Sequence, residues 1–275
     1  MVVQLDQRQD WIRSRRHKRN GAKAARLRRQ FIRYILLTML LLGGVYVFQN
    51  TPWKLADPEK DISISGNMVT SADQIEAVIG DYLDKPIYEM DPKKLEKRIN
   101  MLRSVKFAFV RRYAIPHPRL VIQILEETPW ATFYSDPDGE PEAVIAQSGR
   151  MIPLKDFPNV QQPELKIYGP QTLKMTNADV GQWASWATYI ADQTKQTVES
   201  IDMRQPFDVR VQDGDLVLKL GTPDTTLTRR LGRLASVMEA IEPLRSKIDY
   251  VDLALDNNVP LKLAKKSDLP HGILN

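Results

Sequence analysis

An uncharged apolar stretch near the N-terminus constrains this chain more than any other feature. Residues 34–48 read YILLTMLLLGGVYVF and carry no charged side chain. With Phe31 and Ile32 the stretch reaches about eighteen residues, interrupted only by Arg33. A helix needs roughly 20 residues to cross the hydrocarbon core of a bilayer, and an arginine near its end can extend to the headgroups. We therefore predict a transmembrane helix over residues 31–49.

The segment before this stretch is strongly basic and predicts its orientation. Residues 1–33 hold eleven lysines and arginines against two acids, so this segment carries +9 while the whole chain carries +5. Basic segments flanking a span stay in the cytoplasm. The sequence therefore predicts a basic cytoplasmic tail over residues 1–30 and an extracytoplasmic remainder. Arginine clusters also bind nucleic acid, but directly before a span we interpret them as a topology signal and expect no nucleic-acid partner.

Two alternatives to an uncleaved anchor fit the same stretch. A buried core helix is disfavoured because nothing in the sequence offsets the flanking cations. A cleaved signal peptide has a similar apolar length, but the stretch ends in VYVFQNTPW, without the small residues of a cleavage site, and its basic segment is unusually long. An uncleaved membrane anchor explains the pattern best.

The residues that carry out catalysis or bind metal ions are scarce. The chain has no cysteine, which excludes disulfides and thiolate metal sites. Its three histidines, His17, His117 and His271, are far apart in the sequence, and no nucleophile, phosphate-binding or zinc-protease motif occurs. We interpret Glu126-Glu127 as solvated charges at a strand end, and Asp252 with Asp256 lacks a third metal ligand. We expect no enzyme activity, no cofactor and no metal site.

Local signals predict a small α+β unit over residues 59–127. Alternation over residues 61–65 indicates a strand that ends at a Gly66-Asn67 turn. Ser71 and Gln74 fit a capping box, and Asp91 followed by proline begins a second helix. Two further strands follow, over residues 105–109 and 120–124. The order strand, helix, helix, strand, strand predicts two helices on one face of a three-stranded sheet.

The sequence pattern of residues 128–264 predicts a second domain, made of a mostly antiparallel sheet with two helices. A hairpin surrounds residues 147–150, and Thr176 caps the first helix. Residues 207–211 alternate as a strand, and Thr222-Pro223 begins a second helix that runs through Ile241. Two last strands flank residues 256–258, and residues 265–275 are expected to be disordered. The predicted fold class is therefore α+β: a transmembrane helix, a βααββ unit and a β-domain.

Four stretches, in this order along the chain, resemble one known family. They are Ile64-Ser65-Gly66-Asn67, the pattern P-x-L-x-I-x-I-x-E-x-x-P-x-A over residues 118–131, Ser148 to Leu154, and Tyr250 to Asn257. The βααββ unit resembles a POTRA domain, and the whole arrangement resembles the FtsQ/DivIB family of bacterial cell-division proteins. Ala254 stands where an arginine is expected, and Asn258 where a glycine is usual.

The resemblance implies a non-enzymatic scaffold of the division septum, located in the cell inner membrane. It implies binding to FtsB- and FtsL-type coiled-coil proteins and to other divisome proteins, and through them an influence on septal peptidoglycan synthesis. Another interpretation is an envelope secretion or outer-membrane assembly factor, because POTRA units also bind barrel strands. Such proteins usually carry several POTRA units or a barrel, for which this chain has no room.

The final pair of strands is the predicted partner-binding site, because a sheet edge can accept a strand from another chain. Pro260 supports this placement, since proline is tolerated at edges. The opposite interpretation is that Pro260, Lys262 and Asp252 block pairing. We also expect the POTRA-like unit to offer a second surface. The predicted contact residues are Tyr250, Val251, Asp252, Leu253, Ala254, Leu255, Asp256, Asn257, Val259, Leu261 and Leu263.

Overall fold

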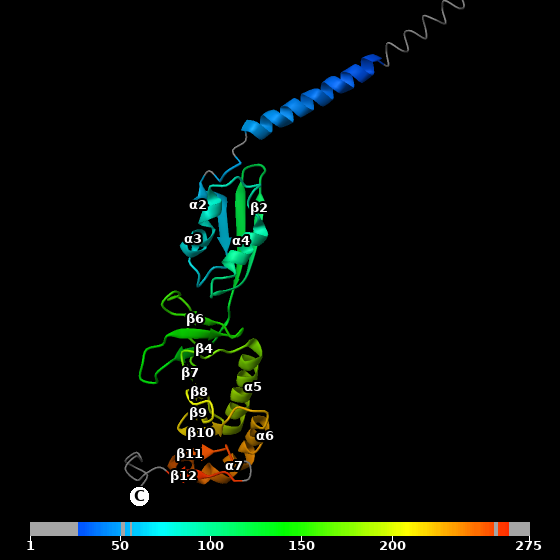
Figure 1. Ribbon diagram of the computed structural model, residues 1–275. Coiled ribbons are helices and arrows are strands. Elements are labelled where there is room, and N and C mark those ends of the chain that lie inside the picture. Colours follow the sequence, from blue (N-terminus) through cyan, green and yellow to red (C-terminus); the bar gives the residue numbers. More distant parts are fainter. Residues whose placement is uncertain (1–26, 51–52, 56, 256–257, 264–275) are drawn as a thin grey trace, which may run out of the picture. The chain divides into compact units, whose positions relative to one another are not determined.

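The computed structural model describes residues 27–50, 53–55, 57–255 and 258–263 (Figure 1). The chain divides into two compact units, Met1–Trp53 and Lys54–Asn275. In the first, one helix runs from Leu27 to Asn50 and is long and apolar enough to cross a membrane. Its 24 residues span about 36 Å. Most of the predicted tail and the predicted C-terminal end lie outside the described residues.

Two aromatic side chains meet at the C-terminal end of this helix. The rings of Phe48 and Trp53 lie 5.2 Å apart between centroids. The indole N–H of Trp53 donates to the carbonyl of Phe48 at 2.6 Å. Tryptophan prefers the boundary between lipid and water, so this pair suits the end of a membrane span.

The second unit begins with the predicted βααββ order. Its three-stranded sheet has the order β1-β3-β2, with β1 parallel and β2 antiparallel to β3. Helices α3 and α4 lie on one face of this sheet (Figure 1). A short helix, α2, was not predicted. The elements are α2 (Pro58–Asp61), β1 (Ile62–Ser65), α3 (Ala72–Leu83), α4 (Pro92–Ile99), β2 (Val105–Tyr113) and β3 (Arg119–Glu126).

Both predicted helix starts are confirmed at the level of individual hydrogen bonds. Ser71 accepts from the backbone N–H of Gln74, whose side chain bonds back to the backbone of Ser71. Asp91 caps α4, and proline occupies the first turn, where its missing N–H costs nothing. The helices bury one apolar face against the sheet, with no exposed area on Ile75, Ile79, Leu95 or Ile99.

A nine-stranded sheet follows, in the order β12-β11-β10-β9-β8-β7-β4-β5-β6. Five of its eight neighbouring pairs are antiparallel, and the fold class α+β is confirmed. The strands are β4 (Pro129–Tyr134), β5 (Ala143–Ala146), β6 (Met151–Pro153), β7 (Lys166–Tyr168), β8 (Val198–Asp202), β9 (Val209–Asp213), β10 (Leu216–Gly221), β11 (Ile248–Asp252) and β12 (Leu261–Leu263).

Helices make two of the three parallel pairs possible. Helix α5 (Asn177–Thr194) connects β7 to β8, while α6 (Leu227–Leu231), α7 (Leu234–Ile241) and the 3₁₀ helix η1 (Glu242–Lys247) connect β10 to β11. Parallel neighbours need such crossovers. These helices cover one face of the sheet (Figure 1) and bury Trp183, Trp186 and Leu234 in the main apolar core.

Two sequence-based predictions in the middle of this domain were wrong, and one strand was missed. The strand predicted from Phe207 begins at Val209, and Phe207 is 78% exposed. The single helix predicted from Thr222-Pro223 begins only at Leu227 and is interrupted between α6 and α7. Arg230 in α6 turns inward and donates to the carbonyls of Leu220 and Thr222, which connects α6 to the end of β10. Strand β8 was not predicted at all.

The capping box of α5 allows a quantitative prediction. The Thr176 hydroxyl accepts from the Asp179 N–H, and the backbone N–H of Thr176 donates to the Asp179 carboxylate and lowers its pKa from the ordinary value of an aspartate. This stabilisation is present above the unfolded pKa and is lost as the pH falls through the folded pKa. We expect Thr176→Ala to lower the free energy of unfolding by about 1 kcal/mol at neutral pH. Urea unfolding followed by tryptophan fluorescence, with Trp183 and Trp186 on the same helix, measures this loss.

Candidate partner-binding edge

Strand β12 forms one end of the nine-stranded sheet. It is three residues long and pairs with β11 on one side, while β11 itself lies between β10 and β12. In the described part of the chain, no strand pairs with the other side of β12. An unpaired strand edge presents backbone donors and acceptors to another chain.

The hydrogen-bond register shows which backbone groups face outward. The N–H of Asp252 donates to the carbonyl of Pro260 at 2.9 Å, and Tyr250 lies opposite Lys262. Successive residues of a strand direct their backbone groups to alternate sides. The N–H and C=O of Leu261 therefore point away from β11, and the open edge is centred on Leu261.

Apolar side chains accompany these outward backbone groups. Leu261 is 44% exposed, Leu263 61% and Leu255, in the loop after β11, 53%. A groove of about 400 Å³ lies between α7 and this edge. Its lining is mostly apolar, so it suits an apolar side chain of a bound segment. The groove is lined by Arg233, Ser236, Val237, Ala240, Ile241, Val259 and Leu261.

Charged groups fix β11 and β12 against each other. Lys262 forms an ion pair with Asp249 at 2.6 Å. The ring of Tyr250 lies between two ammonium groups, with Lys219 Nζ at 3.8 Å from its centroid and Lys262 Nζ at 5.5 Å. These contacts hold the ammonium group of Lys262 against Asp249 and Tyr250. The backbone of the edge therefore stays accessible, with a positive charge beside it.

The structure separates the predicted contact residues into core and surface. Val251 and Leu253 have no exposed area and belong to the core, so their side chains cannot meet a partner. The strand predicted over residues 250–255 ends at Asp252, whose side chain accepts from the Ala254 N–H. Val259 is partly buried against the core. Asp256 and Asn257 lie outside the described residues.

Several residues of this region were missed because they come from distant parts of the sequence. Arg233 donates to the carbonyls of Leu253 and Leu255 and so shapes the loop after β11. Val237 and Ala240 on α7 form one wall of the groove. Their only sequence signal is a second small apolar stripe beside the main apolar face of the helix.

Glu126 and Glu127 correct another prediction, because they are not solvated strand-end charges. The Glu126 carboxylate accepts from the backbone N–H groups of Met68, Val69 and Thr70, at 3.0, 2.9 and 2.7 Å. Glu127 is 6% exposed and lies 3.6 Å from the guanidinium of Arg150. Both carboxylates therefore hold loops in place.

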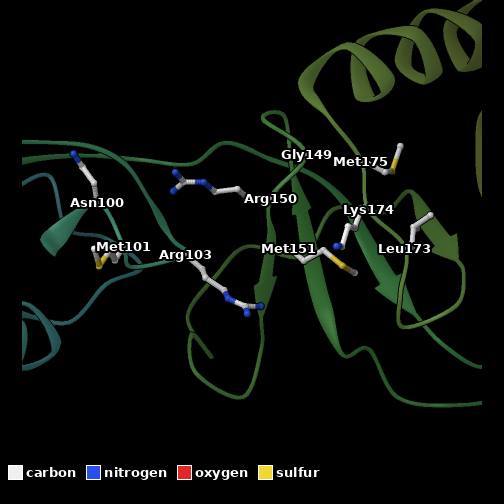
Figure 2. Close-up of a pocket in the computed structure, with 9 residues that line it drawn as sticks. All are labelled: Asn100, Met101, Arg103, Gly149, Arg150, Met151, Leu173, Lys174 and Met175. Atoms are coloured by element: carbon white, nitrogen blue, oxygen red, sulfur yellow. The ribbon is translucent and has the colours of Figure 1, made fainter. Parts of the chain in front are cut away.

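A cleft of about 590 Å³ lies near Arg150 (Figure 2). Its charged lining residues are Arg103, Arg150 and Lys174, and three methionines and a leucine supply most of the rest. Figure 2 shows these cations on different walls, with no carboxylate or hydroxyl side chain among the labelled residues. The lining therefore contains no base paired with a nucleophile. Within the described ranges, no group of three or more His, Asp or Glu residues could hold a metal ion.

Comparison with known proteins identifies the βααββ unit. The family model of the FtsQ-type POTRA domain matches residues 58–127, from the start of α2 to the residue after β3. A search of curated proteins gave no match. This match and the N-terminal apolar helix lie in separate parts of the chain, and both agree with the FtsQ/DivIB resemblance. Residues 58–127 are thus an FtsQ-type POTRA domain that follows an apolar helix, and this arrangement supports the resemblance of the chain to the FtsQ/DivIB family.

Proposed function

We propose that this protein is a non-enzymatic scaffold of the bacterial division septum. The helix Leu27–Asn50 anchors it in the inner membrane, and the POTRA domain and the β-domain bind other division proteins outside the cytoplasm. FtsB- and FtsL-type coiled-coil proteins are the proposed partners, and septal peptidoglycan synthesis is the process that they influence. The FtsQ-type POTRA match supports a role related to division.

The open edge of β12 is the observation that carries the proposed binding mode. A segment of the partner adds as a further strand and bonds to the backbone N–H and C=O of Leu261. One of its side chains enters the groove beside α7. Main-chain bonds of this kind provide affinity, and side-chain pockets provide specificity.

The same edge is built so that it does not bind strands indiscriminately. It has three residues, follows a proline and carries Lys262 at its centre. Short strands, prolines and lysines are the features by which proteins limit unwanted pairing. A partner must therefore supply the groove contact as well as the strand, which restricts binding to a matching sequence.

The POTRA domain offers a second surface for other divisome proteins. Its helix-free sheet face carries Phe107, Phe109 and Leu125, which are 48%, 49% and 60% exposed. Phe107 lies opposite Leu125 in the register, and the two phenylalanine rings are 5.3 Å apart. An exposed apolar cluster of this kind is typical of a protein-binding face.

Co-purification of the full-length chain from detergent-solubilised envelopes of its native bacterium tests this function. We expect FtsB- and FtsL-type proteins among the bound species, and we expect their recovery to fall when the β12 edge is altered. Recovery of outer-membrane barrel precursors in their place would favour the secretion or assembly interpretation. A background identical to that of an unrelated single-span protein would contradict the scaffold proposal.

A further inference from the structure

The folded unit that contains the POTRA sheet follows the apolar helix after a very short connection. Leu55 is only 7% exposed and already belongs to the folded unit that begins at Lys54. Four residues separate it from Asn50, where the helix ends. Because a residue extends at most about 3.6 Å, this connection can reach at most about 18 Å.

The strand register identifies which loops share this end of the sheet. Ile62, the first residue of β1, pairs with Leu120 at the start of β3, and Leu120 pairs with Arg112 near the end of β2. The loop of residues 114–118, between β2 and β3, therefore lies at the end where the chain enters the unit. Arg112 also donates to the carbonyl of Tyr88, at 2.7 Å, and so places the α3–α4 connection at the same end.

The tip of this loop exposes an apolar side chain. Ile115 is 78% exposed, whereas Pro118 in the same loop is buried. Tyr88, in the neighbouring connection, is 51% exposed. Exposure of an isoleucine side chain to water is unfavourable, and tyrosine prefers the boundary between water and lipid.

The side of this loop tip that adjoins the helix-free face of the sheet is basic. Tyr113 pairs with Arg119, whose guanidinium lies 4.7 Å from the ring centroid, and Arg111 is opposite Val121. By strand alternation, the helix-free face of this sheet carries no acidic residue. The acids described at this end lie elsewhere: Asp84 and Glu89 on the α3–α4 connection, and Asp57 and Asp61 at α2, where Asp57 forms an ion pair with Lys60. The tip is therefore apolar, with a positive side towards the open sheet face.

We propose that this tip rests on the surface of the bilayer that holds the apolar helix, with Ile115 in the interface and Arg111 and Arg119 against anionic headgroups. The inference rests on the membrane anchor of the proposed function. A single apolar side chain with two arginines binds lipid weakly on its own. The short tether keeps the tip at high local concentration near the surface, so that weak contacts suffice.

The absence of cysteine makes a direct test simple, because one introduced cysteine carries the only label. The full-length chain with Ile115→Cys, bearing an environment-sensitive fluorophore, is placed in nanodiscs with a nitroxide-labelled lipid. Met68→Cys is the matched control, since Met68 is 87% exposed at the other end of the same sheet. Val45→Cys, inside the apolar helix, reports that the helix is inserted.

We expect a blue-shifted and quenched label at position 115 in phosphatidylglycerol nanodiscs, weaker in phosphatidylcholine nanodiscs, and neither effect at position 68. Arg111→Gln and Arg119→Gln should each lower the ratio of lipid-contacting to free tips by about fivefold. Equal signals at positions 115 and 68 would overturn the proposal while leaving partner binding at β12 untouched. A label at position 115 that shifts only when a partner protein is added would identify a protein contact and likewise overturn it. No quenching at position 45 would overturn this proposal together with the membrane anchor.

Discussion

Leu261→Pro is expected to weaken partner binding at the β12 edge strongly while the β-domain stays folded. The N–H of Leu261 points away from β11, so proline removes a donor that only a partner uses. A carbonyl of the partner would then be buried without a donor, which costs about 1–3 kcal/mol. We expect a loss of affinity of tenfold or more. Co-purification of FtsB- and FtsL-type proteins with the full-length chain measures it.

Two variants at neighbouring positions separate binding from folding. Leu261→Val keeps the outward N–H and much of the apolar side chain, and should bind nearly as the parent does. Lys262→Pro removes an N–H on the side that faces β11, so it should loosen β12 itself. Normal binding by a folded Leu261→Pro variant would show that β12 is not the surface to which the partner adds.

The POTRA domain was predictable from the sequence because its signals are local. A capping box at Ser71, proline in the first turn of α4 and alternation in β2 and β3 each need only a few residues. Strand β8 shows the opposite case. Its buried residues Val198 and Ile201 are three apart, because the register shifts between Val198 and Ser200. The irregularity removes the two-residue period by which a strand is recognised.

The partner-binding edge was only partly predictable, for a different physical reason. Alternation over Val251 and Leu253 marks residues that are buried, because the apolar face of a strand packs on a core. Whether a strand lies inside a sheet or at its end depends on pairing between distant segments. Alternation alone therefore does not distinguish buried Val251 from exposed Leu263. The sequence predicted the correct hairpin but not which of its side chains reach solvent.

Glu126→Ala is expected to destabilise the POTRA domain by about 3 kcal/mol or more. The carboxylate accepts from three consecutive backbone N–H groups, those of Met68, Val69 and Thr70, and alanine leaves all three without this acceptor. Bonds to a charged acceptor contribute about 1.5–3 kcal/mol each, and water can replace part of this where the loop is exposed. Amide hydrogen exchange of β1 and β3 in increasing urea measures the loss.

The turn that precedes these N–H groups prevents the loop from moving to bring them to another acceptor. Gly66 has a φ of +83°, and a Cβ there would lie 2.1 Å from the carbonyl oxygen of Ile124. The backbone at Gly66 therefore packs closely against β3, near the Glu126 carboxylate. This close packing and the hydrogen bonds to Glu126 together fix the turn. Glu126→Gln keeps one neutral acceptor and should lose less stability than Glu126→Ala, while the exposed Glu140→Ala should change nothing. If Glu126→Ala unfolds within about 0.5 kcal/mol of the parent, solvent already satisfies these N–H groups and the carboxylate does not hold the turn.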